Sequence, residues 1–266
     1  MENSLVKKGL TGNQIKIIGV VLMAIDHIYQ MFFMYGVPTW VDWFGRPVAI
    51  IFLFFCAEGF FYTRSRKKYL LQLFIGFELM NIISFLLSRA MPSEVMLINS
   101  IFGTLFLTAF LMLAADTIRD GVKTKRRSKI IGGILLFLAP FAASVLIMLI
   151  LPLLSDGTLP SWSIEFIVAI PNFLTTEGFV YFPLLGLLFY LLRKNRLIQL
   201  IPLVVFCILN AVMKSTEWMA IFAAIPILLY NGQRGKGSKY FFYIFYPAHI
   251  YAFYIISWLI GLIYVK

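Results

Sequence analysis

Long apolar segments recur along this sequence and decide its structural class. Each runs for about 20 predominantly apolar residues, the length that a helix needs to cross a hydrocarbon core of about 30 Å. Glycine, proline or clustered charge separates one segment from the next. Hydrophobic residues make up 61% of the 266 positions, whereas soluble domains have about 45 to 50%. The sequence therefore predicts an all-α, polytopic membrane protein, a helical bundle that forms a single domain over residues 1–266.

The apolar segments predict about nine transmembrane helices. We expect them at 16–34, 46–63, 69–88, 96–117, 130–151, 176–192, 197–213, 217–230 and 240–263. The eighth is short. The stretch 161–175 is also apolar, but Pro160, Pro171 and Asn172 interrupt it, which favours a re-entrant or interfacial segment. If that stretch crosses the membrane, the count becomes ten.

The basic residues predict the orientation of the chain, because short cytoplasmic connections collect Lys and Arg. Alternate connections between the predicted spans hold 19 of the 23 Lys and Arg residues. This places the N-terminus in the cytoplasm and the C-terminus outside. The formal net charge of +11 is then mostly a matter of topology, and a nucleic-acid partner is not needed to explain it.

Most soluble-enzyme chemistry is excluded by the residues that the sequence lacks. Cys56 and Cys207 both lie within apolar runs, which argues against a disulfide framework and a cysteine metal site. His27 and His249 are the only histidines, too few for an HExxH motif or a histidine cluster. GxGxxG, P-loop and GxSxG motifs are also absent. We expect no metal.

Several ionisable residues fall at membrane depth, where a charge costs about 2.5–3.5 kcal/mol and usually marks a functional site. Asp26 and His27 lie about 15 Å along the first predicted span, and Glu78 and His249 lie about 14 Å along theirs. Glu58 lies on the second span. Such groups are expected to converge in a polar cavity. The alternative is a set of separate structural pairs, for example Asp26 with Arg46.

Histidine is suited to proton transfer, because its ordinary pKa of about 6.5 lies near neutrality. His27 is the stronger candidate for a general base, with Asp26, Glu58 and His249 as further catalytic candidates. Pro247, two residues before His249, predicts a break in the last span. A packing or capping role for either histidine remains the alternative.

A basic cluster between the second and third spans is the candidate site for a phosphorylated ligand. It consists of Arg64, Arg66, Lys67 and Lys68, and Arg binds phosphate in bidentate fashion while Lys adds a point charge. Arg46 completes the set of cofactor-binding candidates. The alternative for the cluster is a determinant of topology. Basic runs at 123–129 and 234–239 could share the phosphate site, although anionic lipid headgroups would also hold them.

Several motifs together resemble the TraX family of bacterial integral membrane proteins. They are LTGNQIKII at 10–18, AIDHI at 24–28, FGRP at 44–47, AEGFFYTRSRKKY at 57–69, FYLLRKNR at 189–196 and FYPAHI at 245–250. The resemblance implies a multi-span acyltransferase of the bacterial cytoplasmic membrane that uses cytosolic acetyl-CoA. The family namesake is linked to N-terminal acetylation of conjugative pilin, so the implied acceptor is a pilin-like peptide, a glycan or a small molecule.

The resemblance and the buried residues together suggest one mechanism. Acetyl-CoA would approach from the cytoplasm with its phosphates on Arg64, Arg66, Lys67 and Lys68. His27 would take the proton from an attacking amine or hydroxyl, with Asp26 or Glu58 orienting its ring. A covalent acetyl-histidine is the alternative route. The rival functions are a proton-coupled transporter, in which the buried acids and histidines form a relay, and a non-catalytic membrane subunit of a secretion or conjugation machine.

Overall fold

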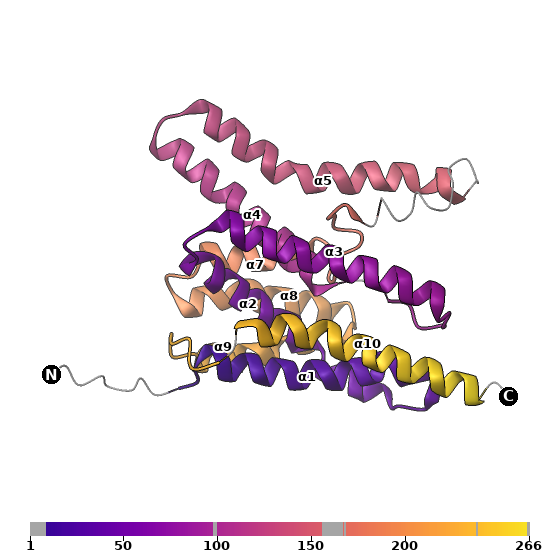
Figure 1. Ribbon diagram of the computed structural model, residues 1–266. Helices are drawn as coiled ribbons and strands as arrows, with labels where there is room; N and C mark the ends of the chain where they lie inside the picture. The colour runs from indigo at the N-terminus through magenta and orange to yellow at the C-terminus, as the bar shows by residue number, and fades with distance from the viewer. Residues whose placement is uncertain (1–8, 98–99, 156–166, 168, 238, 265–266) are drawn as a thin grey trace. The chain divides into compact units, whose positions relative to one another are not determined.

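The computed structural model describes residues 9–97, 100–155, 167, 169–237 and 239–264. These residues are predominantly helical, and no β-strand occurs among them (Figure 1). The chain divides into two compact units. The first unit comprises Met1–Phe55 and Leu192–Lys266, and the second comprises Cys56–Leu191.

The first unit contains both ends of the chain. Its elements are α1 (Gly12–Phe32), η1 (Phe33–Tyr35), η2 (Thr39–Phe44), the beginning of α2 (Arg46–Tyr62), α8 (Arg196–Val212), η3 (Thr216–Ala223), α9 (Ala224–Leu229) and α10 (Lys239–Tyr264).

A capping box starts α1. The Thr11 hydroxyl accepts a hydrogen bond from the backbone N–H of Gln14, and the Gln14 side chain accepts one from the backbone of Thr11, which satisfies two N–H groups that a bare helix end would leave unpaired.

Helices α1 and α10 run side by side in the same direction (Figure 1). Residues 10–13 and 229–234 exchange four backbone hydrogen bonds of 2.8–2.9 Å, so the start of α1 is tied to the segment that leads into α10. Further along, the Ser257 hydroxyl donates to the carbonyl of Met31 at 2.6 Å, and the Tyr35 hydroxyl donates to the carbonyl of Ser257 at 2.8 Å. These contacts set the register between the two helices.

The second unit comprises the rest of α2, then α3 (Arg66–Ala90), α4 (Ile101–Lys123), α5 (Arg127–Ser155) and α7 (Tyr181–Leu191). Helix α4 packs against α3, α5 and α7. Helices α4 and α5 form a hairpin joined by a short basic turn. Helix α5 bends in its middle (Figure 1), as expected for a helix that carries Pro140, because proline removes one backbone hydrogen bond and its ring clashes with the preceding turn.

Each of the nine predicted spans corresponds to a helical element. Six of these elements are long and apolar enough to cross a membrane: Gly12–Tyr35, Thr39–Tyr62, Arg66–Ala90, Ile101–Lys123, Arg127–Leu153 and Tyr240–Ile263. The other three, Tyr181–Leu191, Arg196–Val212 and Thr216–Leu229, are apolar but shorter. The all-helical character is therefore confirmed for the described residues, six helices fit a membrane protein by length and composition, and the count of nine or ten crossings stays a prediction. Of the ambiguous stretch 161–175, residues 161–166 and 168 lie outside the described residues, and residues 171–175 form loops and turns.

Two helices begin several residues inside their predicted spans, and one predicted helix break does not occur. Helix α4 begins at Ile101 rather than at residue 96, because the Ser100 hydroxyl caps it by accepting from the N–H of Phe102. Helix α7 begins at Tyr181 rather than at residue 176, because the preceding residues form turns. The predicted break at Pro247 is wrong. Helix α10 continues through Pro247, as helices of membrane-spanning length can when nearby groups satisfy the freed carbonyl.

Candidate functional site

The two histidines of the chain meet inside the first unit. His27 on α1 and His249 on α10 place Nδ1 and Nε2, respectively, 2.6 Å apart. Their ring centroids are 4.8 Å apart. A distance of this size between two ring nitrogens is a hydrogen bond, so one nitrogen carries the proton and the other accepts it. The parallel packing of α1 and α10 is what brings these two side chains together.

Aromatic rings and a backbone carbonyl hold His249 in place. Its side chain is almost completely buried, with 7% of the residue exposed. The ring stacks on Phe245 at 4.7 Å between centroids and makes edge contacts with Tyr246 and Phe253. Its Nδ1 lies 2.7 Å from the carbonyl oxygen of Phe245. Because a carbonyl can only accept, Nδ1 of His249 carries a proton.

These contacts determine the tautomers of a neutral pair. With its proton on Nδ1, neutral His249 presents Nε2 as an acceptor. Nδ1 of His27 must then be the donor in the bond between the rings. A neutral His27 protonated on Nδ1 leaves its Nε2 without a proton. The arrangement therefore gives His27 a basic nitrogen, in the tautomer and ring orientation that His249 imposes.

Asp26 precedes His27 but has a different partner. Its Oδ2 accepts a hydrogen bond of 2.6 Å from Gln30, one helical turn further along α1. Its carboxylate also lies against Gly45, where a Cβ atom would come within 2.1 Å of Oδ1. A Cβ atom at position 45 would force the Asp26 side chain to move, so the glycine favours this close approach of α1 and η2. Asp26 helps to fix the position of α1 beside the start of α2.

Arg46 organises a charged network at the start of α2. Its guanidinium pairs with Asp42 and with Glu217, which links η2 to η3. Sequence reasoning did not select either acid. The i,i+4 spacing of Asp42 and Arg46 is a signal that could have found the first pair. No local pattern connects Glu217 to Arg46, which lies 171 positions away.

Two further cations of the first unit lie over aromatic rings. The Lys16 ammonium lies 5.1 Å from the ring centroid of Phe55 and 5.6 Å from that of Phe242. Arg196 lies in the same way over Phe54 and Tyr230, at 4.7 and 5.4 Å. Such cation–π contacts stabilise a charge where water is scarce. Neither cation is among the site residues that the sequence predicted.

Lys16 also has a defined position relative to His27. The two residues are eleven positions apart on α1, which is close to three helical turns. They therefore project from the same face of the helix, with their Cα atoms about 16 Å apart. This spacing is a sequence signal that could have joined Lys16 to the histidine site.

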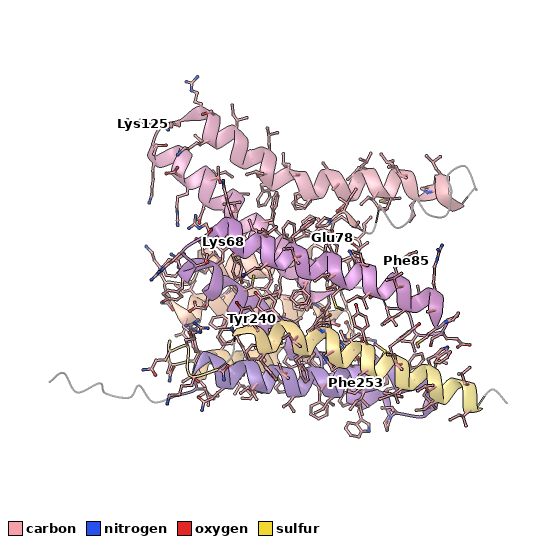
Figure 2. All side chains as sticks on the ribbon, in the orientation of Figure 1. Lys68, Glu78, Phe85, Lys125, Tyr240 and Phe253 are labelled. Atoms are coloured by element: carbon pink, nitrogen blue, oxygen red, sulfur yellow. The ribbon has the colours of Figure 1, made fainter. Side chains whose placement is uncertain are left out.

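The predicted phosphate cluster lies in the second unit at the start of α3, where Figure 2 labels Lys68. Arg64, Lys67 and Lys68 are exposed. Arg66 is engaged within the unit, because it forms an ion pair of 2.6 Å with Asp116. The Tyr190 hydroxyl donates to the same carboxylate at 2.7 Å. Three of the four cations thus face solvent, and the fourth connects α3 to α4.

The two glutamates from the sequence analysis also belong to the second unit. Glu58 is half-buried near the end of α2. Glu78 lies in the middle of α3, as Figure 2 shows, and its Oε1 atom is buried without a hydrogen-bond partner among the described residues. Within the part of the chain that the structure describes, no three His, Cys, Asp or Glu side chains are grouped as metal ligands.

Comparison with known proteins places this architecture in a family. A family model described as TraX protein matches residues 11–257, which is most of the chain and includes both histidines. The chain belongs to the TraX family. The resemblance inferred from the sequence motifs is therefore confirmed. No solved structure matches the chain.

A curated relative of the TraX-family chain extends over nearly the same length. It is a probable fimbrial assembly protein, FimC of serogroup H1, from Dichelobacter nodosus. The two sequences are 26% identical over 248 residues, which cover 89% of this chain and 91% of the relative. The similarity is therefore to a whole protein and not to one domain of a larger one.

Proposed function

We propose that this TraX-family protein is a membrane-embedded acetyltransferase that moves an acetyl group from acetyl-CoA to an amine or hydroxyl acceptor. The preferred acceptor is the N-terminal amine of a pilin-type subunit. Two findings support this choice: the family is associated with pilin acetylation, and the relative from Dichelobacter nodosus is a probable fimbrial assembly protein. The basic connections would face the cytoplasm, where acetyl-CoA is available.

The histidine pair is the observation on which the chemistry depends. Nε2 of His27 removes the proton from the acceptor nitrogen as that nitrogen attacks the thioester carbonyl. The new C–N bond forms, the C–S bond breaks, and the proton passes from His27 to the departing CoA thiolate. His249 accepts a hydrogen bond from Nδ1 of His27 throughout, so it stabilises the imidazolium that exists between the two proton transfers, as the third member of a triad does.

One lysine on α1 and a group of basic residues at the start of α3 are the candidates for holding the donor phosphates. Lys16 lies on the same face of α1 as His27, about three turns away. Arg64, Lys67 and Lys68 form the exposed group at the start of α3, where the helix N-terminus adds further positive potential. Arg66 is a weaker candidate because Asp116 already neutralises it. Either group would act mainly on the affinity for acetyl-CoA.

The deciding experiment follows the acetyl group. Membranes that contain the protein and a pilin-type subunit are incubated with acetyl-CoA labelled in the acetyl group, and mass spectrometry locates the label. The proposal expects labelled subunit with the wild-type protein and none with His27→Ala. Ile28→Ala is the matched control, because Ile28 is 40% exposed on the same turn of α1. Equal labelling by wild type and His27→Ala would contradict the assignment of the base.

A proton-coupled transporter is the second candidate, and the hydrogen bond between the histidines favours it as well, since such a bond can pass a proton. A transporter needs no acyl donor. Acetyl-CoA should stabilise the purified enzyme against thermal unfolding, because a ligand that binds only the folded state raises its stability. Proton uptake by proteoliposomes, without any stabilisation by acetyl-CoA, would favour the transporter.

A further inference from the structure

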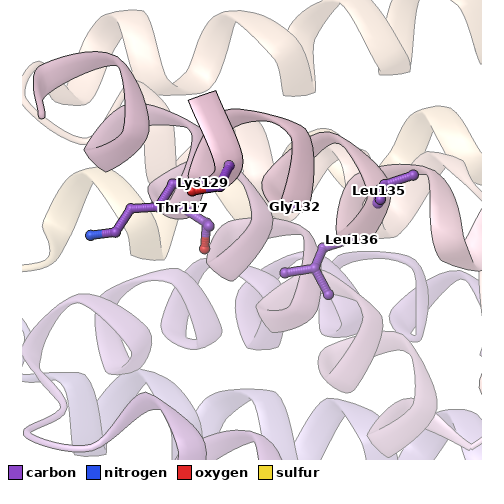
Figure 3. A pocket seen from close by; sticks show the side chains of 6 residues that line it. Thr117, Lys129, Gly132, Leu135 and Leu136 are labelled. Carbon is purple, nitrogen blue, oxygen red and sulfur yellow. The ribbon is translucent and has the colours of Figure 1, made fainter. Parts of the chain in front are cut away.

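An open groove lies along the α4–α5 hairpin of the second unit, next to its basic turn (Figure 3). Its volume is about 550 Å³, and six residues line it: Thr117, Ser128, Lys129, Gly132, Leu135 and Leu136. The polar side chains of Lys129 and Thr117 lie toward one end, and the two leucines lie toward the other (Figure 3). The lining is therefore mostly apolar, with its polar groups gathered at one end.

A glycine keeps the groove open. A Cβ atom at Gly132 would meet no other atom within 4 Å. Its neighbour Gly133 is different, because a Cβ there would come within 2.6 Å of Ile118, and Gly121 makes a similar close approach to Ile130. Gly121 and Gly133 therefore allow α4 and α5 to pack closely. Gly132 has no such packing role. Because it has no side chain, the space beside it stays open and forms part of the groove.

The polar end of the groove lies in a strongly positive stretch. Residues 120–129 contain five Lys or Arg residues and one Asp, a net charge of +4. Residues 122–128 of this stretch are exposed. The N-terminus of α5, a helix of 29 residues, adds its positive dipole end. Lys129 pairs with Asp120, so a single carboxylate already occupies the place that an anionic group would take.

The other end of the groove is apolar and opens to the surroundings. Leu135 is 63% exposed, and Ile131, Ile134 and Leu138 are exposed around it. Only 11% of the 18-residue apolar stretch of α5 is buried. In a chain of this class, such a surface is covered by acyl chains. A ligand that fills the whole groove must therefore carry a negative charge at one end and hydrocarbon at the other.

We propose that this groove binds one anionic phospholipid. Its phosphate lies near Lys129 and Ser128 and displaces Asp120 from the Lys129 ammonium. One of its acyl chains runs past Gly132 toward Leu136. Charge complementarity selects the anionic headgroup, and the exposed apolar end selects a lipid over a soluble phosphate compound. The site is separate from the histidine pair, and the inference does not depend on the proposed activity.

Native mass spectrometry of the delipidated, full-length protein tests the proposal. Dioleoyl-phosphatidylglycerol and dioleoyl-phosphatidylcholine are titrated separately, since the two lipids share their acyl chains and differ in headgroup charge. We expect one phosphatidylglycerol molecule to bind several-fold more tightly than phosphatidylcholine. Gly132→Phe should abolish this preference by filling the groove. Ile134→Phe adds the same ring at a 45% exposed position outside the lining and should leave the preference intact.

Charge variants give a second, independent readout. Lys129→Gln should weaken phosphatidylglycerol binding about five-fold, the effect of one basic residue near a membrane surface. Asp120→Asn should strengthen the binding, because it removes the competing carboxylate. Lys214→Gln, outside the hairpin, should change nothing. Unchanged binding in Gly132→Phe, equal affinities for the two lipids, or displacement of the bound lipid by inorganic phosphate would each overturn the proposal.

Discussion

Nδ1 of His27 and Nε2 of His249 form a hydrogen bond of 2.6 Å across 222 positions of sequence. Because Nδ1 of His249 is committed to the Phe245 carbonyl, the pair has a direction: His27 donates and His249 accepts. The direction distinguishes the two residues chemically. His27 keeps a free basic nitrogen, and His249 serves as its positioning partner.

Substitutions at the two histidines should therefore have unequal effects. His27→Ala removes the proposed base and should lower kcat by about 10²–10⁴-fold. His249→Gln keeps a side-chain oxygen that can accept from His27 Nδ1, so it should retain more activity than His249→Ala. The measurement is the initial rate of acetyl transfer from labelled acetyl-CoA. Equal rates in His249→Gln and His249→Ala would show that the acceptor at position 249 does not matter.

Gly45→Ala should destabilise the protein, because its Cβ would collide with the Asp26 carboxylate. Overpacking of this kind costs about 1–3 kcal/mol. Asp26→Ala removes the obstructing atoms, so the double variant should lose less stability than the sum of the two single variants. Thermal unfolding of the four proteins in detergent measures the coupling. Strict additivity would mean that the two residues do not touch.

Substitutions of the basic residues at the start of α3 should have two different effects, one on the KM for acetyl-CoA and one on stability. Neutralising Arg64, Lys67 and Lys68 together should raise the KM for acetyl-CoA if they hold its phosphates, and the effect should shrink at high salt. Arg66→Gln should instead lower stability, because it leaves Asp116 without its cation. Lys16→Gln tests the other candidate group by the same kinetics. A KM that rises only in Lys16→Gln would exclude the α3 residues.

Ser257→Ala should test the register between α1 and α10. The buried hydroxyl of Ser257 donates to the carbonyl of Met31, and a hydrogen bond of this type contributes about 0.5–1.5 kcal/mol. The expected result is a modest loss of thermal stability together with a lower acetylation rate, because this contact lies on the same helix pair as the histidines. A stable variant with normal activity would show that other contacts set the register.

The sequence alone predicted much of the fold and several residues of the site. The length and spacing of the apolar segments located nine helical elements. The physical reason is that an apolar segment in a bilayer must satisfy its backbone hydrogen bonds internally, which a helix does. Membrane depth singled out His27 and His249, since an ionisable group there is costly. Helix boundaries were less accurate where a cap decided them, as at Ser100, and the break expected at Pro247 did not occur.

The sequence did not predict the ion pairs between residues that lie far apart in the chain. Arg66 looks like a phosphate ligand beside its basic neighbours, and only the packing of α3 on α4 revealed its pairing with Asp116. Glu217 has no local relation to Arg46, yet the two form an ion pair. Local patterns report how one helix is formed, whereas partners across helices depend on the rotation and register of each pair.

The sequence by itself determined that this chain is helical and that several of its helices are long and apolar enough to cross a membrane, because these properties follow from hydrophobicity and helical period alone. The angle of about 100° between neighbours on one helix also indicates that Asp26 is not the hydrogen-bond partner of His27. Only the tertiary structure decided that this partner is His249. The physical reason is that contacts between helices depend on the rotation and register with which the two helices pack, which neither helix determines by itself.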